Sequence, residues 1–180
     1  MSSLLSYQRY HALMVAISSC VNQELLPSLK GKVMLDLGTG SGIGLKVLGE
    51  HGACVIGVDT FPVYARGPEQ LFGPTTYAGV VRADIRDLPI RLESIDGVAS
   101  FLSPVFINKK FKHGLMTTAK SLRPGVFVVG SSYMREEIID LEKTLVQCGV
   151  QGGIRVNRHA VIDPVMGVAP DAWMYIGKKI

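Results

Sequence analysis

The sequence predicts an α/β protein with a doubly wound, mostly parallel sheet of seven strands that ends in an antiparallel C-terminal hairpin strand. Short apolar segments alternate with segments of helical periodicity, which is typical of strands buried on both faces between crossover helices. A glycine-rich turn joins the first of these strands to the next helix. Only loop residues separate the last two apolar segments, so no crossover helix fits there.

The N-terminal segment predicts a helix over residues 4–26. Apolar side chains recur there at helical spacings, and Pro27 ends the pattern. The uncharged stretch 10–23 is shorter than the ~20 apolar residues that span a bilayer. Its apolar run 12–17 is short for a signal-peptide core of ~7–15 residues. We therefore expect a helix in a cytoplasmic protein that has no contact with a membrane.

Five strands and three helices are expected next along the chain, followed by the hairpin. The expected strands are 32–37, 53–59, 77–83, 95–102 and 125–131, the expected helices are 43–51, 108–122 and 134–148, and the hairpin strands are 153–160 and 172–178. Segment 61–74 contains three prolines and two glycines, so any helix in it is short and broken.

The composition fits one folded domain. With 180 residues and 47% hydrophobic residues, the chain is too apolar for a disordered protein. We expect one domain over residues 1–180, with a helical cap at 1–30 and a core at 31–180. Only 19% of residues are charged. A sheet covered on both faces explains much of this, and the rest indicates either an apolar substrate pocket or a homodimer contact.

Charge and cysteine content exclude further classes. A net charge of +4 over a whole domain is weak evidence for nucleic-acid binding, so nucleic acid is an open but less favoured partner. Cys20, Cys54 and Cys148 are scattered. They suit neither a disulfide framework nor a zinc site, and they favour a reducing compartment. We expect no bound metal.

The chemistry concentrates in a turn that follows the first strand, with glycines at 38, 40 and 42. Glycines allow a sharp turn and a close approach of the backbone to a ligand. The next helix directs its free N–H groups and its positive dipole end at the same place, which favours an anionic group. Asp59 ends the second strand, where a carboxylate suits ribose hydroxyls. The pattern indicates an adenosine-containing ligand, although a plain tight turn and a helix-capping Asp59 are the alternatives.

The run Asp36-x-Gly38-x-Gly40-x-Gly42 resembles the signature of class I S-adenosylmethionine-dependent methyltransferases and differs from the G-x-G-x-x-G of dinucleotide folds. Segments 58–61, 82–89, 95–98 and 122–125 are similar to that family's later motifs, in the same order. The last hairpin strand, which contains Trp173-Met174-Tyr175-Ile176, is where the family places its reversed strand. The resemblance covers residues 30–180. It implies a Rossmann-like fold, S-adenosylmethionine as cofactor and methyl transfer.

The resemblance also implies a set of cofactor-binding residues. It places Asp59 at the ribose, Phe61 near the adenine and Asp84 at the adenine amine. Asp36 is expected to organise the turn, and Asp96 to be structural. The complete predicted set is Asp36, Gly38, Gly40, Gly42, Asp59, Thr60, Phe61, Asp84, Ile85 and Ser100.

The family's acceptor pocket lies above the ends of the fourth and fifth strands, beneath the N-terminal helix. The candidate substrate contacts are Tyr7, Tyr10, Phe101, Ser103 and Phe106. His11 is the candidate general base, ahead of His51, His113 and His159. Residues 100–106 lack the Asn/Asp-Pro-Pro-aromatic motif of enzymes that methylate amino groups of bases or glutamine. The Lys-Asp-Lys-Glu set of ribose methyltransferases is not found either.

The predicted function is in-line methyl transfer from S-adenosylmethionine to a small, fairly apolar molecule. The net charge of +4 leaves RNA or protein open as the acceptor. The lack of a convincing base leaves a non-catalytic subunit that binds S-adenosylmethionine or a partner. A nicotinamide oxidoreductase is the least favoured alternative.

Overall fold

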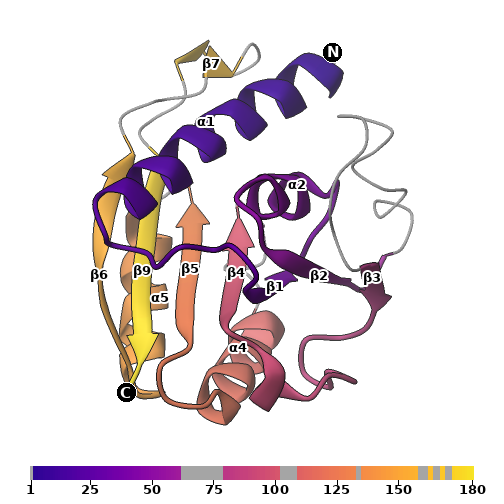
Figure 1. The fold of residues 1–180 in the computed structure, drawn as a ribbon, viewed down its shortest axis with the longest axis vertical. Coiled ribbons are helices and arrows are strands. Elements are labelled where there is room, and N and C mark those ends of the chain that lie inside the picture. Colours follow the sequence, from indigo (N-terminus) through magenta and orange to yellow (C-terminus); the bar gives the residue numbers. More distant parts are fainter. Residues whose placement is uncertain are drawn as a thin grey trace.

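The computed structural model describes residues 2–61, 79–101, 109–132, 135–157, 162–163, 167–168 and 172–180. Its centre is a seven-stranded sheet in the order β3-β2-β1-β4-β5-β9-β6 (Figure 1). The strands are β1 (Val33–Leu37), β2 (Cys54–Asp59), β3 (Gly79–Arg82), β4 (Gly97–Phe101), β5 (Phe127–Ser132), β6 (Val150–Asn157) and β9 (Ala172–Lys179). The strands β1 to β5 are parallel to one another, and β9 is antiparallel to both β5 and β6. The predicted fold class is confirmed.

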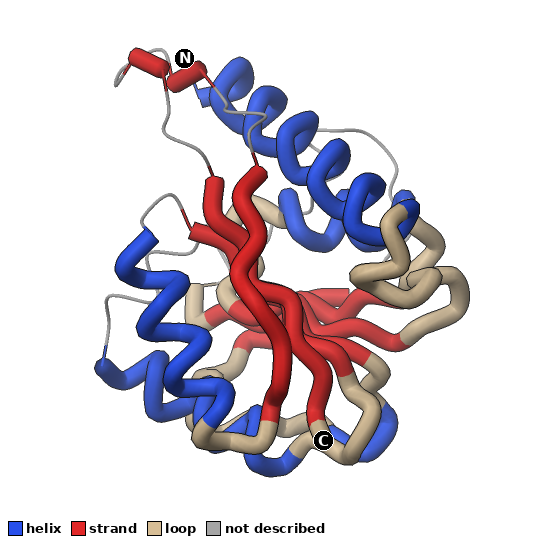
Figure 2. Tube along the Cα trace, turned by 90° about the vertical axis from the view of Figure 1, so that its left-hand side faces the viewer, coloured by secondary structure: helices blue, strands red, loops and turns tan. Residues whose placement is uncertain are grey.

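Helices cover both faces of this sheet (Figures 1 and 2). One face carries α1 (Ser2–Asn22) and α2 (Ile43–Glu50), and the other carries α4 (Lys109–Ser121) and α5 (Arg135–Val146). A short 3₁₀ helix, η1 (Leu92–Ser94), precedes β4. None of the described helices combines the length and the hydrophobicity that a membrane span requires.

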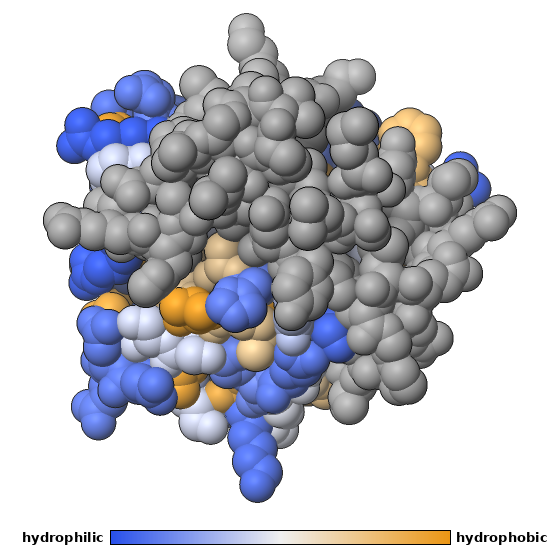
Figure 3. All heavy atoms as spheres, turned by 90° about the horizontal axis from the view of Figure 1, so that it is seen from above, coloured by the Kyte–Doolittle hydropathy of each residue, from blue (hydrophilic) through white to orange (hydrophobic). Residues whose placement is uncertain are grey.

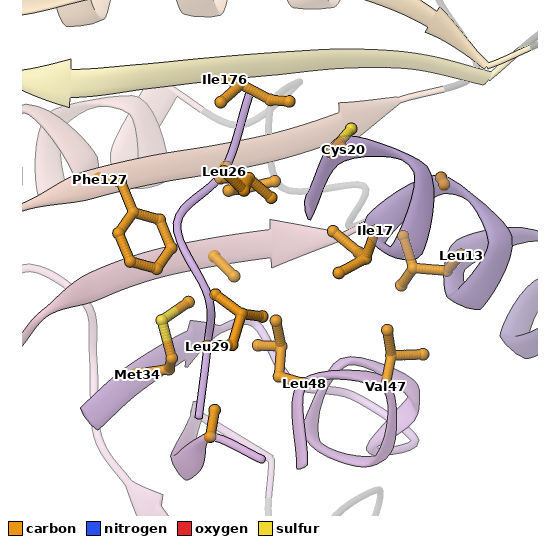
Figure 4. Packing of buried hydrophobic residues seen from close by; sticks show 14 of the residues in the cluster. Leu13, Ile17, Cys20, Leu26, Leu29, Met34, Val47, Leu48, Phe127 and Ile176 are labelled. Atoms are coloured by element: carbon orange, nitrogen blue, oxygen red, sulfur yellow. The ribbon is translucent and has the colours of Figure 1, made fainter. Parts of the chain in front are cut away.

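Each sheet face has its own hydrophobic core. On the α1 side, Ile17 of α1 and Leu48 of α2 pack with Met34 and Phe127 of the sheet (Figure 4). On the other side, side chains of α4 and α5 pack on Leu35, Val98 and neighbouring strand residues. Central strands therefore have no solvent face, which explains much of the high hydrophobic and low charged content.

The N-terminal helix ends earlier than the sequence pattern predicts. It stops at Asn22, because Glu24 adopts a left-handed backbone conformation with φ 58°. The N–H of Leu25 then donates to the carbonyl of Cys20 at 2.9 Å and the N–H of Glu24 to that of Val21 at 3.1 Å, as in a Schellman-type helix end. Leu26 still reaches the core from the connection to β1 (Figure 4).

The C-terminal hairpin also differs from its predicted bounds. The strand β6 covers Val150–Asn157, three residues earlier than expected, because Gly152 belongs to the strand. A Cβ at Gly152 would lie 2.1 Å from the carbonyl oxygen of Ile176, so only glycine allows this approach of β9. The loop between the hairpin strands carries an unpredicted two-stranded ribbon, β7 (Ile162–Asp163) with β8 (Gly167–Val168). Residues 158–160 of the predicted strand lie outside the described residues.

The parallel strands bring their carboxyl ends to one edge of the sheet, and the order reverses between β1 and β4. Open α/β sheets bind ligands at such a switch point. The first turns of α1 lie at the same end of the molecule (Figures 1 and 2). Seen from that end, the described surface is mostly hydrophilic with smaller hydrophobic areas (Figure 3).

Candidate cofactor site at the carboxyl edge of the sheet

The turn after β1 has the backbone conformation that its glycines allow. Gly38, Gly40 and Gly42 all have left-handed φ angles, of 72°, 50° and 82°. Such angles strain other residues, so the glycines are required by the backbone itself. The N–H groups of Gly38 and Thr39 donate to the carbonyl of Val58 in β2, at 2.8 and 3.1 Å. The turn is thus fixed against β2, and Gly42 caps α2 without a side-chain bond to its first N–H groups.

Asp36 lies beneath this turn and is only 2% exposed. Its carboxylate accepts a 2.7 Å hydrogen bond from the Thr39 hydroxyl and another from the backbone of Leu45. A Cβ at Gly44 would lie 2.5 Å from the Asp36 carboxylate, so α2 can pass only with glycine there. The pKa of Asp36 is raised to about 7, chiefly by burial and in smaller part by the charge of Asp59. The hydrogen bond from Thr39 acts in the opposite direction and lowers this pKa. These contacts are those of a residue that shapes the turn, and a direct contact with the cofactor stays a prediction.

Asp59 ties the end of β2 to the turn. One carboxylate oxygen accepts from the N–H of Gly40 and the other from the N–H of Phe61, both at 2.9 Å. A carboxylate has about four lone-pair sites, so these two bonds leave acceptor capacity for hydroxyl groups. Thr60 is exposed, and the Phe61 side chain is 65% exposed at the same edge. The predicted ribose and adenine contacts are therefore brought together with the glycine turn.

The next two predicted residues follow β3 and differ in their surroundings. Asp84 forms a bidentate pair with Arg86, whose Nε lies 2.9 and 3.0 Å from the two carboxylate oxygens. This hydrogen bonding raises the pKa of Arg86. Ile85 is 9% exposed and packs in the core beneath α4, where a Cβ at Gly114 would lie 2.6 Å from it. Both roles at the adenine stay predictions.

Ser100 connects the two central strands at the switch point. Its side chain is 3% exposed and donates a 2.9 Å hydrogen bond to the carbonyl of Leu37. The last residue of β4, Phe101, is partly buried and packs against the core on the α1 side. Ser103, Phe106 and the side chain of Tyr7 lie outside the described residues, as does His159.

The two described candidates on α1 differ in their contacts. The hydroxyl of Tyr10 donates to the carboxylate of Glu50 on α2, and His11 is exposed. His51 has a structural place, since its ring contacts Ser18 at 2.9 Å and the carbonyl of Val47 at 2.8 Å. The contacts of the described residues therefore do not single out a general base.

Sequence reasoning missed two residues of this site. Thr39 is 6% exposed and holds Asp36, and Lys46 is 8% exposed on the buried side of α2. The signal for Lys46 was a charged residue among apolar neighbours of a core helix. Thr39 carried no such signal, because its hydrogen bond exists only once the turn has closed.

A cavity of about 550 Å³ lies away from this site, and none of the predicted site residues lines it. It is lined by residues at the amino ends of the parallel strands, including Lys32, Asp96 and Arg123. Asp96 accepts from the N–H of Val33 at 2.9 Å and from Arg123 at 2.8 Å, which agrees with the structural role expected for it. In the described part of the chain, no three His, Cys, Asp or Glu side chains group as metal ligands would.

Comparison with known proteins assigns the family. Residues 35–129 match the model of the methyltransferase domain family. A methyltransferase from Methanosarcina mazei, described as dependent on S-adenosylmethionine, has a TM-score of 0.67 at 15% identity, with 89% of this chain and 97% of that chain covered. Magnesium protoporphyrin IX methyltransferase from Synechocystis, with S-adenosylmethionine bound, has a TM-score of 0.66 at 12% identity, covering 97% and 80%.

A third solved structure, an S-adenosylmethionine-dependent methyltransferase from Mesorhizobium loti, has a TM-score of 0.63 at 18% identity, covering 87% and 95%. No curated protein matches the chain. The family match spans more than half of the chain, from within β1 to within β5, and includes the glycine turn. The chain belongs to the methyltransferase domain family, and it has the class I fold whose cofactor is S-adenosylmethionine.

Proposed function

We propose that this protein transfers the methyl group of S-adenosylmethionine to a small, fairly apolar acceptor. The observation that carries the proposal is the glycine turn. Its three left-handed glycines lie against Asp59, which bonds both to the turn at Gly40 and to the segment after β2. This arrangement offers backbone N–H groups, the start of α2 and a carboxylate within one short edge of the sheet.

The residues of the site fit this cofactor. Gly40 could carry no side chain without strain, and its position leaves the backbone open to a ligand. The N–H groups at the start of α2 suit a carboxylate, and Asp59 retains acceptor capacity for ribose hydroxyls. The cofactor, when bound, would supply a methyl group on a positively charged sulfur, with S-adenosylhomocysteine as the leaving group of an in-line displacement. Asp36, Thr39 and Ser100 hold the turn and the two central strands in position, which is the main contribution that such a displacement needs.

Aromatic side chains, a low content of charged residues and a missing motif support a small, apolar acceptor. Aromatic side chains flank the edge, with Phe61 65% exposed and Phe101 partly buried. The chain's few charges and the missing amino-methyltransferase motif point the same way. Among similar folds, the Synechocystis enzyme acts on magnesium protoporphyrin IX and a Geobacter metallireducens enzyme on precorrin-6y.

RNA is the second candidate acceptor, because the net charge is +4 and a Pyrococcus horikoshii neighbour carries a provisional RNA methyltransferase description. Binding to RNA would fall steeply with added salt. A non-catalytic, donor-binding subunit would bind the donor but label no acceptor. Incubation with labelled S-adenosylmethionine and fractionated cell extract separates these candidates and a protein acceptor, because the label enters small molecules, RNA, protein or nothing.

Calorimetry with S-adenosylmethionine and S-adenosylhomocysteine tests the donor site. We expect Asp59→Ala to weaken binding at least about ten-fold, because a carboxylate that accepts hydrogen bonds contributes roughly 1.5–3 kcal/mol. Asp87→Ala is the matched control, since Asp87 is an exposed acid after β3. No binding by the wild type, or equal binding by Asp59→Ala, would contradict the proposal.

A further inference from the structure

Lys46 is a buried charge in the contact between α1 and α2. Its ammonium lies 2.8 Å from the Glu50 carboxylate one turn later, and 5.5 Å from the centre of the Tyr10 ring on α1. The Tyr10 hydroxyl donates to the other oxygen of the same carboxylate. Burial acts to raise the pKa of Glu50, but the hydrogen bonds from Lys46 and Tyr10 prevail and lower it. The three side chains form one polar contact that joins the two helices.

The same lysine contacts the glycine turn through its backbone. Its N–H donates a 3.1 Å hydrogen bond to the carbonyl of Gly42, which caps α2 in a left-handed conformation. One turn of helix therefore separates the proposed donor site from the contact with α1.

The contact at Tyr10 lies toward the functional edge of the molecule. The first turns of α1 are at the carboxyl end of the strands (Figures 1 and 2). Farther along α1, Ser18 contacts His51 at 2.9 Å, and Ile17 is fully buried in the core. The later part of α1 is thus fixed by packing, while the polar contact fixes the part nearer the edge.

Stability alone does not require an ion pair between these helices. Apolar side chains often replace both members of such a pair without loss, whereas removing one member alone is costly, and a polar contact can specify one arrangement. We propose that Lys46 is a positioning residue that couples donor binding at the glycine turn to the seating of α1 through Glu50 and Tyr10. Donor binding then orders the helix beside the acceptor end, so the donor binds first. This inference rests on the proposed function.

Hydrogen exchange measured by mass spectrometry tests the coupling in wild type, Lys46→Met and Lys112→Met. The control removes an exposed ion pair between α4 and α5, Lys112 with Asp140 at 2.7 Å, on the other side of the sheet. In Lys46→Met without ligand, we expect residues 10–14 to exchange about ten-fold faster, while residues 17–22 and the sheet are unchanged. Tyr10→Phe keeps the ring beneath the ammonium and should have a smaller effect.

S-adenosylhomocysteine is the probe for the second half of the test. It should slow exchange in α1 about three-fold or more in wild type and Lys112→Met, but not in Lys46→Met. Its affinity should fall in Lys46→Met by the same factor, because coupling between two sites is reciprocal. The inference would be overturned if α1 of Lys46→Met exchanged at the wild-type rate, or if S-adenosylhomocysteine slowed exchange in this variant as much as in the wild type. If the wild type does not bind the ligand, the proposed function and the coupling both fail, while the ligand-free comparison still decides whether Lys46 seats α1.

Discussion

The buried carboxyl of Asp36 makes the stability of this protein depend on pH near neutrality. Its pKa is about 7 in the folded protein, against an ordinary value of 3.8, because burial disfavours the charged form. Between these two values the folded state keeps a proton that the unfolded state has lost. The contribution of Asp36 to stability therefore falls as the pH rises from about 4 to about 7, and this contribution is constant above that.

The size of this effect follows from the same two values. At 1.36 kcal/mol for each pH unit, the change from 3.8 to about 7 corresponds to about 4 kcal/mol of unfolding free energy. Integrating the titration gives about 3 kcal/mol of it between pH 5 and pH 8. The lowered pKa values of Glu50 and Asp96 act in the opposite sense, but only as the pH falls through and below about 4.

Asp36→Asn removes the titration and keeps the shape. The amide oxygen can accept from the Leu45 backbone, and the amide nitrogen can donate to the Thr39 hydroxyl. Urea unfolding, followed by the fluorescence of the single tryptophan, Trp173, measures both proteins at pH 5, 6, 7 and 8. We expect the variant to gain about 3 kcal/mol relative to wild type between pH 5 and pH 8. Asp87→Asn, which alters an exposed acid, should follow the wild type. An equal difference between wild type and Asp36→Asn at all four pH values would refute the reasoning.

Two more substitutions test the packing beneath the site. Gly97→Ala should destabilise the protein by about 1–3 kcal/mol in the same assay, because its Cβ would lie 2.5 Å from both Met34 Sδ and a Phe127 ring atom; unchanged stability would show that the two neighbours can yield. Ser100→Ala should cost about 1–3 kcal/mol and weaken S-adenosylhomocysteine binding in calorimetry, because the carbonyl of Leu37 loses its side-chain partner between β1 and β4; equal stability and equal affinity would remove Ser100 from the site.

The sequence predicted the strands and the glycine turn because both depend on local information. A short apolar run bounded by turn residues predicts a buried strand. Three alternating glycines after an acid predict a tight turn with left-handed backbone conformations, whatever surrounds them. The antiparallel direction of the last strand followed from the missing last crossover, whereas the spatial order of the strands came only from the structure. The left-handed φ angles at 38, 40 and 42 confirm the conformational part of that prediction.

The contacts that needed the folded chain were not predictable. Glu24 ends α1 in a left-handed conformation that a glutamate adopts only when its surroundings favour it. The predicted strand began at Gly153 and left out Gly152. Gly152 belongs to β6 because β9 approaches it closely at Ile176, which no local pattern records. The bond of Tyr10 to Glu50 joins positions 40 residues apart, so no local pattern predicted it, and the substrate contact of Tyr10 stays a prediction.

The distribution of buried polar groups locates function in an otherwise apolar molecule. Eight polar or charged side chains are buried among the described residues, and five of them lie at the carboxyl ends of β1, β4 and β5 or in the glycine turn: Asp36, Thr39, Ser100, Ser131 and Ser132. Burying such groups costs free energy unless each has a partner, and an apolar core is the simpler solution wherever only stability matters. Their concentration at one edge of the sheet is therefore best explained by cofactor binding at that edge. The same reasoning applies to Lys46, a buried charge that lies one helical turn from that edge.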